Sequence, residues 1–447
     1  MKIPAALLEN FKIKENLNAL IYLGASVFSA LVGLVMLRFF TKYLGPEDIG
    51  IFGYVTTVNA FLIPLFTINL NSFYIKKVYQ STNSSEPKEL LGTIVLFSLV
   101  WTIFVIIFLT FFGGWIFGFY KIKVAFYPYM FLTLLSNIFI GATSIIVLQY
   151  RILSKAWMYF MINALQTLLL IGMGYAFVGI IHWGIYGRIY GVFIGSTLIG
   201  IISVVLLLPY IKWTINKQIL KEGLKFSMPL IPYTLAILLY DMLDRVFLER
   251  YSSSMASTGI YNIGAQFALI IGMLSLAFYR SYEPVIYKLI EEGNESVVAK
   301  KVLMLNNLLL LISILFILFA GPVINYITHG KFTNSVILAA LLVIAFYFKS
   351  AYILFNTILA AHSKTKEIMI FSLLGLGFII VTSIFIVPKY NNMGTAYIKT
   401  TLYMLMCIGS FFLTKKTAIY KRYILHTLIS GIGLFVLVAL LNRAGYL

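Results

Sequence analysis

Long apolar runs separated by short polar connectors divide this chain, and that pattern limits the folds open to it. A helix needs about 20 predominantly apolar residues to cross the hydrocarbon core of a bilayer. Only 11% of the residues are charged, against about 25% in soluble domains. The pattern therefore predicts an all-α polytopic membrane protein. The thirteen predicted spans are Leu17–Phe40, Ile49–Ser72, Leu91–Phe112, Phe126–Gln149, Met158–His182, Gly187–Pro209, Ser227–Leu248, Thr258–Tyr282, Val302–Ile327, Val336–Ala361, Met369–Val387, Met393–Leu413 and Ile424–Leu441.

The composition argues against several classes of function. The chain has one cysteine, Cys407, and four histidines that lie far apart in sequence. We therefore expect no disulfide framework, no metal site and no cofactor. No GxxxxGK[ST] motif for nucleotide binding occurs. In so apolar a chain, the net charge of +19 indicates loop lysines that set topology and meet anionic lipids, rather than nucleic-acid binding.

The distribution of lysine and arginine among the loops predicts the orientation. The charged and apolar residues of Met1–Asn18 indicate an amphipathic arm at the membrane surface, and no cleavage site of a signal peptide follows it. The positive-inside rule places the N-terminus and the basic loops in the cytoplasm. If Ile424–Leu441 crosses the membrane, the C-terminus lies outside. The basic residues of the cytoplasmic loops are Lys76, Lys77, Lys88, Arg151, Lys155, Lys212, Lys217, Lys221, Lys225, Arg280, Lys288, Lys300, Lys301, Lys364, Lys366, Lys415, Lys416, Lys421 and Arg422.

A weak internal repeat predicts two homologous lobes. Gly50-Ile51-Phe52 opens the second span and Gly259-Ile260-Tyr261 opens the eighth (259 − 50 = 209). Ser154-Lys155 and Ser363-Lys364 share this offset, and Gly184 and Gly394 differ by 210. Because each lobe holds six spans, the two are parallel, as in transporters that rock around a central cavity. We predict an N-terminal lobe at 1–211, a basic connector at 212–225, a C-terminal lobe at 226–415 and an additional span within 416–447.

One loop motif carries a family resemblance. Tyr43-Leu44-Gly45-Pro46-Glu47-Asp48-Ile49-Gly50, with Asp244-Arg245 and Gly259-Ile260-Tyr261, resembles the Wzx-type polysaccharide flippases. These O-antigen and capsule translocases belong to the MOP superfamily, which includes the MATE drug exporters and the lipid II flippase. The resemblance covers roughly residues 10–415, and the thirteenth span departs from the usual twelve.

The resemblance implies a V-shaped pair of six-helix lobes around a central cavity. The implied substrate is an undecaprenyl-diphosphate-linked oligosaccharide that is turned from the inner to the outer leaflet of a bacterial inner membrane. Its doubly anionic headgroup must cross an apolar core of about 30 Å. Cations inside the spans would offset the desolvation of the diphosphate. Polysaccharide polymerase or ligase machinery would be a possible partner.

Lys349 is the strongest candidate for a substrate-binding cation. It lies near the middle of Val336–Ala361, too deep for its ammonium to reach the surface easily. Charged side chains within spans are costly and commonly functional. The alternative is a structural lysine that is bonded to a neighbouring helix.

The seventh predicted span carries the candidates for ion coupling. Asp241, Asp244 and Arg245 share one helical face. Either carboxylate could bind H⁺ or Na⁺ and couple its import to lobe closure, or Asp241 and Arg245 could form a structural ion pair. Pro229 and Pro232 precede them and would permit a bending gate or a static kink.

Further residues extend the candidate site. Pro64 interrupts the second span as the two other prolines interrupt the seventh. Amides in spans two and eight could bind sugar hydroxyls or join helices by hydrogen bonds: they are Asn59, Asn69, Asn262 and Gln266. Four more cations could line the cavity or lie at the headgroups: they are Arg38, Lys399, Arg151 and Arg280.

Three other functions remain open from the residues alone. An ion-coupled exporter of cationic drugs predicts a cavity rich in carboxylates, whereas the charges within these spans are mostly positive. A membrane enzyme that handles polyprenyl-phosphate sugars predicts a large extramembrane loop, and no connector is long enough to fold as a domain. A structural scaffold does not explain the charges within spans. We therefore expect a transporter and not an enzyme.

Overall fold

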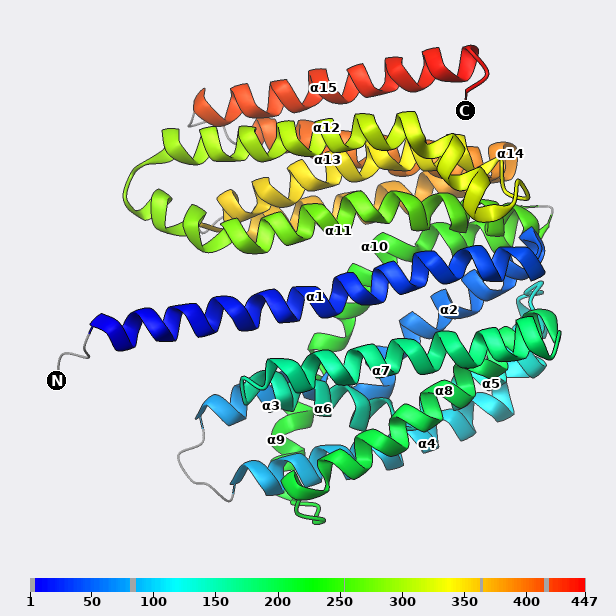
Figure 1. Ribbon diagram of the computed structural model, residues 1–447, viewed down its shortest axis with the longest axis vertical. Coiled ribbons are helices and arrows are strands. Elements are labelled where there is room, and N and C mark those ends of the chain that lie inside the picture. Colours follow the sequence, from blue (N-terminus) through cyan, green and yellow to red (C-terminus); the bar gives the residue numbers. More distant parts are fainter. Residues whose placement is uncertain (1–4, 81–85, 253, 362–364, 414–417, 447) are drawn as a thin grey trace. The chain divides into compact units, whose positions relative to one another are not determined.

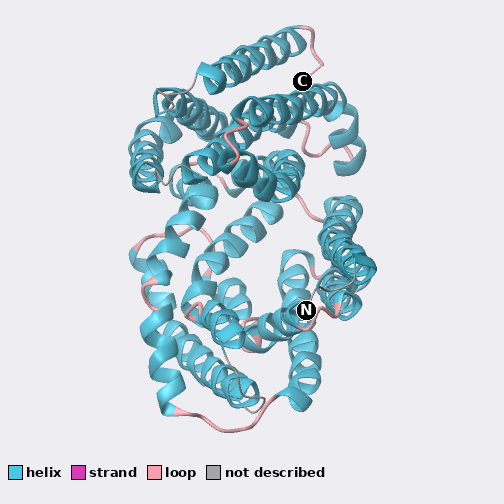
Figure 2. Cartoon of the chain, turned by 90° about the vertical axis from the view of Figure 1, so that its left-hand side faces the viewer, coloured by secondary structure: helices cyan, strands magenta, loops and turns pink. Residues whose placement is uncertain are grey.

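A computed structural model describes residues 5–80, 86–252, 254–361, 365–413 and 418–446. Within these ranges the regular structure is entirely helical (Figure 2). Apolar residues dominate the helices, as crossing the hydrocarbon core of a bilayer requires. A helix also pairs its backbone hydrogen-bonding groups internally, which lipid cannot do for it.

Helices α1 to α8 form the first half of the chain (Figure 1). Two π-helical turns, η1 and η2, and one 3₁₀ turn, η3, interrupt or end them. The elements are α1 (Ala5–Tyr43), α2 (Pro46–Thr67), α3 (Leu70–Gln80), α4 (Glu86–Phe119), η1 (Phe126–Met130), α5 (Phe131–Leu135), α6 (Ile140–Ile152), α7 (Ala156–Tyr175), η2 (Ala176–Ile180), α8 (Gly184–Leu207) and η3 (Leu208–Tyr210).

The second half begins with a short polar helix and then returns to long apolar ones. A non-helical residue, Asn391, divides the longest helix, α14, into two parts. The elements are α9 (Lys217–Ser227), α10 (Leu230–Tyr251), α11 (Met255–Glu291), α12 (Glu295–Thr328), α13 (Ser335–Ala361), α14 (Thr365–Leu413) and α15 (Ala418–Arg443).

Eleven helices within the described residues are long and apolar enough to cross a membrane. Each of the thirteen predicted spans falls on described helices. Two predicted spans share α14, and α10, which carries several charges, is not among the eleven. The prediction of an all-α, multi-pass membrane protein is confirmed.

The helix boundaries repeat along the chain at one offset. Helix α12 ends 209 residues after α4 (328 − 119 = 209). Helix α13 begins 209 residues after η1, which opens the segment from η1 to α6 (335 − 126 = 209). Left-handed backbone recurs as well, at Lys121 and Gly330 and at His182 and Asn391. These coincidences support the internal repeat that the sequence motifs suggest.

The described chain forms two compact units, one of residues 1–44 and 54–242 and the other of residues 45–53 and 243–447. The division falls inside α2 and α10 rather than between helices. The four segments expected from the sequence, 1–211, 212–225, 226–415 and 416–447, stay a prediction.

Helices α7 and α8 pack closely within the first unit because glycines face the contact. A Cβ at Gly191 would lie 2.4 Å from the Cα of Gly174, and one at Gly195 would lie 2.8 Å from the carbonyl oxygen of Leu169. Small residues of this kind let backbones approach in membrane proteins. Helix α1 packs on the same α7.

Helix α13 is the centre of the second unit and contacts α11, α12, α14 and α15. Helix α15 joins this bundle at Gly431, where an added Cβ would meet the ring of Phe348. A polar contact accompanies this packing, because Asn306 of α12 donates to the Tyr347 hydroxyl over 2.8 Å. The last apolar run therefore belongs to the packed bundle.

The three predicted prolines lie at or near helix breaks in the first unit. Pro64 is buried in α2, and left-handed Ile68 and Asn69 separate α2 from α3. Pro229 lies in the turn between α9 and α10, and Pro232 lies in the first turn of α10. The Asn69 side chain donates to Thr234 of α10 over 3.1 Å, so the two breaks are joined. Bending of the helices at these prolines during function stays a prediction.

Candidate functional site: a buried charge cluster on α10, α11 and α14

A close crossing of α2 and α11 within the second unit supports the candidate site. A Cβ at Gly50 would lie 1.9 Å from the carbonyl oxygen of Met255. A Cβ at Gly259 would lie 1.8 Å from the carbonyl oxygen of Pro46. Gly50 and Gly259, like Pro46 and Met255, are separated by 209 residues, so the repeat-related helix starts meet by equivalent contacts. Glycine is needed at both positions.

Asp244 of α10 is the centre of a buried cluster. Its Oδ2 accepts a hydrogen bond from the Lys399 ammonium over 2.7 Å and another from the Tyr261 hydroxyl over 2.6 Å. Its Oδ1 accepts the backbone N–H of Arg245 over 2.8 Å. Asp244 and Lys399 are each 8% exposed. Charge-assisted hydrogen bonds of this kind are strong, and a buried carboxylate needs them.

Arg245 extends the cluster toward the start of α2. Its guanidinium lies 3.8 Å from Asp244 Oδ1, and its Nε donates to Asn262 Oδ1 over 3.1 Å. A Cβ at Gly53 would lie 2.7 Å from the Asn262 amide nitrogen. The absence of a side chain at Gly53 therefore leaves the space that the Asn262 amide occupies.

Two cations share one carboxylate in this cluster, so Asp244, Lys399 and Arg245 together carry a formal charge of +1. A second carboxylate, Glu249, lies one turn beyond Arg245 on α10 and is 3% exposed. Glu249 falls just outside the predicted seventh span and is absent from the predicted site. An arrangement with more than one cation per central carboxylate can bind an anion when that carboxylate is protonated or displaced.

Lys349 is half-buried on α13 between aromatic rings. Its ammonium lies 5.7 Å from the ring centroid of Phe346 and 5.5 Å from that of Tyr403. Tyr403 lies one turn after Lys399 on α14. The Lys349 ammonium of α13 therefore lies against the side of α14 that carries Lys399. The cation–π distances are within the attractive range. Contact between Lys349 and the substrate stays a prediction.

Two further cations lie within helices of the first unit. Arg38 is half-buried near the end of α1. The Arg188 guanidinium lies 4.0 Å from the ring centroid of Phe40 and donates to the Leu170 carbonyl over 3.4 Å. Arg188 is the second residue of the predicted span Gly187–Pro209, whereas α8 begins earlier, at Gly184. The left-handed backbone of Gly184 starts that helix, and sequence alone does not reveal it.

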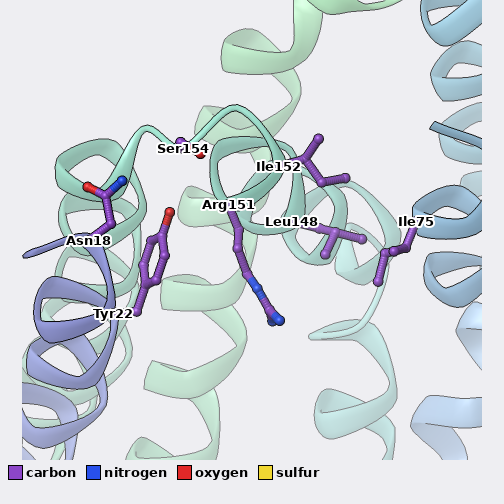
Figure 3. Close-up of a pocket in the computed structure, with 7 residues that line it drawn as sticks. All are labelled: Asn18, Tyr22, Ile75, Leu148, Arg151, Ile152 and Ser154. Atoms are coloured by element: carbon purple, nitrogen blue, oxygen red, sulfur yellow. The ribbon is translucent and has the colours of Figure 1, made fainter. Parts of the chain in front are cut away.

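Arg151 lines a pocket of about 310 Å³ in the first unit, at the end of α6. Figure 3 shows its side chain extending between Tyr22 of α1 and Leu148 of α6. Asn18 and Ser154 supply further polar groups to the same pocket. Among the described residues, no hydrogen bond or ion pair engages this guanidinium. The pocket can therefore accept an anion beside a partly apolar wall.

Several other predicted residues cannot be assigned to the cluster or to the pocket. The side chains of Asp241 and Arg280 lie outside the described residues, as does the whole of Ser363-Lys364. No group of three or more His, Cys, Asp and Glu side chains in the described part of the chain could hold a metal ion.

Comparison with known proteins identifies the family. A family model described as "Polysaccharide biosynthesis protein" matches residues 17–290, well over half of the chain. The chain belongs to the polysaccharide biosynthesis protein family. A sequence comparison with curated proteins finds no match.

Solved structures share the fold of this chain. A structure of the lipid II flippase MurJ in an inward closed conformation has a TM-score of 0.67 at 17% identity, covering 95% of this chain and 99% of the other. An inward-facing multidrug resistance MATE family transporter of the MOP superfamily has a TM-score of 0.62 at 14% identity, with 90% and 100% covered. The MATE multidrug transporter DinF-BH also has a TM-score of 0.62, at 16% identity, with 92% and 96% covered. The predicted likeness to MOP-superfamily folds is confirmed.

Proposed function

We propose that this protein is a flippase for undecaprenyl-diphosphate-linked oligosaccharide repeat units, such as those of O-antigen or capsule. It moves them by alternating access from the inner to the outer leaflet of a bacterial inner membrane, with its N-terminus in the cytoplasm. Membership of the polysaccharide biosynthesis protein family supports a glycan substrate. The fold shared with lipid and drug transporters supports translocation rather than catalysis.

The observation that carries the proposal is the convergence of two cations on the central carboxylate of the buried cluster. Lys399 and Arg245 both contact Asp244, and Lys349 lies beside Tyr403, one helical turn after Lys399 on α14. A diphosphate can replace a carboxylate as the partner of two cations, and arginine suits phosphate oxygens in particular. Charge at this depth is costly, and two cations that converge on one carboxylate suit an anionic ligand.

Protonation of Asp244 provides a means of coupling transport to an ion gradient. A neutral Asp244 would no longer attract Lys399 and Arg245, and both cations would become available to the diphosphate. Two cations beside Asp244 repel Na⁺ and also favour the ionised carboxylate, so we propose that H⁺ is taken up as Lys399 and Arg245 separate from Asp244. Return of the proton to solvent would restore the ion pair and expel the substrate. Asp241 remains a second candidate for coupling.

The other predicted cations would bind the headgroup at other points along its path. The Arg151 pocket, predicted to lie at the cytoplasmic face, would meet the incoming diphosphate. Arg38 and Arg280 would contact the diphosphate after Arg151 along the same path. A drug exporter is less well supported, because the buried carboxylate of Asp244 already binds Lys399 over 2.7 Å and is not available to a cationic drug.

A strain that lacks this gene provides the decisive test. We expect the completed undecaprenyl-diphosphate-linked repeat unit to accumulate in the cytoplasmic leaflet while surface glycan is lost, and the wild-type gene to restore both. The leaflet is assigned by accessibility of the glycan to a membrane-impermeant glycosidase in spheroplasts. Normal glycan together with new sensitivity to cationic drugs would overturn the flippase proposal.

The coupling proposal has a separate test in the Asp244→Asn variant. An amide at this position mimics the protonated acid, so translocation in inverted vesicles should lose its response to a collapsed proton gradient. Wild-type vesicles, treated in parallel with a protonophore and with a sodium ionophore, supply the control. If both vesicle types respond equally to the protonophore, Asp244 is not the coupling group.

A further inference from the structure

A second polar cavity lies in the first unit, apart from the charge cluster. Its volume is about 470 Å³, within the range of roughly 300–1,000 Å³ that is usual for small-molecule sites. Residues of α2, of α6 and the turn before it, and of α7 and α8 line it. None of the side chains that line the cavity carries a charge. This distinguishes the cavity from the cationic cluster.

The polar wall consists of amides and hydroxyls. Asn137 donates to the Asn59 side chain over 2.7 Å and to the Thr133 carbonyl over 2.8 Å. Asn163 donates to the Tyr159 carbonyl over 2.7 Å, which leaves its own side-chain oxygen as an acceptor. These bonds fix the orientation of the amides and leave hydrogen-bonding capacity for a ligand.

Gln166 of α7 and Ser196 of α8 complete this wall. Within the described residues neither side chain has a hydrogen-bond partner. Both side chains are half-buried, so each keeps a polar group that is accessible to a ligand in the cavity. Their position on a cavity indicates a ligand that both donates and accepts hydrogen bonds.

The lining also includes apolar side chains, among them Ile63, Phe139 and Leu170. A sugar ring has hydroxyls at its edge and C–H groups on its faces, so a lining that mixes amides and hydroxyls with aromatic and aliphatic groups matches it. A diphosphate or a drug cation would find no countercharge among the lining residues. The chemistry of the cavity therefore selects an uncharged saccharide.

The second half of the chain shows that the repeated scaffold does not require a polar wall here. The positions 209 residues after Asn137, Ser144 and Ser196 carry Phe346, Ile353 and Leu405. The Phe346 ring packs against α11, where a Cβ added at Gly272 would lie 3.0 Å from it. The polar residues at these three positions of the first half are thus not repeated in the second half.

We propose that this cavity is a binding site for an uncharged sugar of the transported oligosaccharide and contributes to the choice of glycan. The inference rests on the proposed flippase function for the origin of the sugar. Binding of the sugar itself can nevertheless be measured without transport.

The test uses the full-length protein in nanodiscs and saturation-transfer difference NMR. The probe is the oligosaccharide released by mild acid from the lipid-linked glycan of the producing strain. Wild-type protein should bind it, and Gln166→Leu with Ser196→Leu should weaken binding about tenfold, as expected for the loss of two hydrogen bonds. Inorganic pyrophosphate should not compete. Leu168→Met, at an exposed position of the same α7, is the matched control.

The outcomes separate the two proposals. Equal binding by the wild type and the double variant, no binding by the wild type, or competition by pyrophosphate would each overturn the sugar site while leaving the flippase proposal intact. Binding that the double variant loses, in a protein whose deletion leaves the glycan on the normal leaflet, would support the site and overturn the flippase. The thermal unfolding temperature of both variants is measured first, so that misfolding is not mistaken for loss of binding.

Discussion

Helices at corresponding positions of the two halves carry different chemistry. In the second half, Asp244 is held by Lys399 and Tyr261. The positions 209 residues earlier carry Val35, Tyr190 and Phe52, so the first half lacks these charges. It has instead an uncharged, amide-lined cavity of about 470 Å³.

This difference shows how a repeated scaffold can divide the recognition of one amphiphilic headgroup. Helix ends are kept at one offset, as α4 and α12 demonstrate, whereas the charged residues of the cluster and several polar residues of the cavity are not. On our proposals, the second half recognises the anionic diphosphate and the first half recognises uncharged sugar. Substitutions that exchange residues between equivalent positions test this division.

The largest effect on stability is expected from Lys399→Met. The substitution removes the ammonium that lies 2.7 Å from the buried Asp244, and loss of one member of a buried pair costs about 3–5 kcal/mol. Thermal unfolding of the purified variant in detergent measures the loss. Tyr190→Phe, at the equivalent position of the first half, should cost far less. Adding Asp244→Asn to Lys399→Met should restore much of the stability, and failure to do so would contradict a pairwise role.

Lys349→Ala should abolish translocation while leaving the abundance of the protein in the membrane unchanged. The equivalent position of the first half carries Ile140, so the helix tolerates an apolar side chain there. Surface glycan and membrane abundance are measured in the complemented deletion strain, with Lys349→Arg as the variant that retains the charge. Normal surface glycan in the alanine variant would remove Lys349 from the mechanism.

Gly259→Val should destabilise the protein by about 1–3 kcal/mol, the usual cost of overpacking. A Cβ at this glycine would lie 1.8 Å from a backbone oxygen of α2, and that atom cannot move without the helix. Gly24→Val in α1 is the control because nothing lies within 4 Å of its added Cβ. Equal unfolding temperatures for the two variants would show that the crossing is not constrained.

The smallest effect is expected from the pair of Lys77 on α3 and Glu222 on α9, which are 2.6 Å apart and exposed. The hydrogen bond and charge of Lys77 lower the pKa of Glu222 from its usual value. A lowered pKa means that the pair stabilises the fold above the unfolded pKa of the carboxyl and that this contribution is lost as pH falls through the lowered pKa. Unfolding followed from neutral pH down through the acid range should show a slightly weaker acid dependence in Glu222→Gln. An identical pH profile would show that the pair is fully screened.

The helices and their repeat could be predicted largely from sequence, because apolar length decides membrane insertion and follows local composition. Gly50 and Gly259 marked the offset before the structure revealed that they contact each other's helices. Lys399, Arg245 and Asp244 were also identified individually. Their convergence could not be predicted, because it depends on where α14 places Lys399 relative to Asp244 of α10.

Other residues depended on boundaries that composition does not define. Arg188 and Glu249 lie inside helices although the sequence placed them at the ends of spans. The left-handed backbone that starts α8 is a local conformation with no apolar signature. The cavity in the first half is harder still to foresee, since its amides come from α2, the turn before α6, and α7.

The sequence by itself determined that this chain is a helical, many-spanned membrane protein with an excess of cations and an internal repeat, because hydrophobic length and charge are properties of short segments. Only the tertiary structure decided which charges meet and which amides line a cavity. Those pairings depend on contacts between helices more than a hundred residues apart in sequence, as Asp244 with Lys399 and Asn59 with Gln166 illustrate.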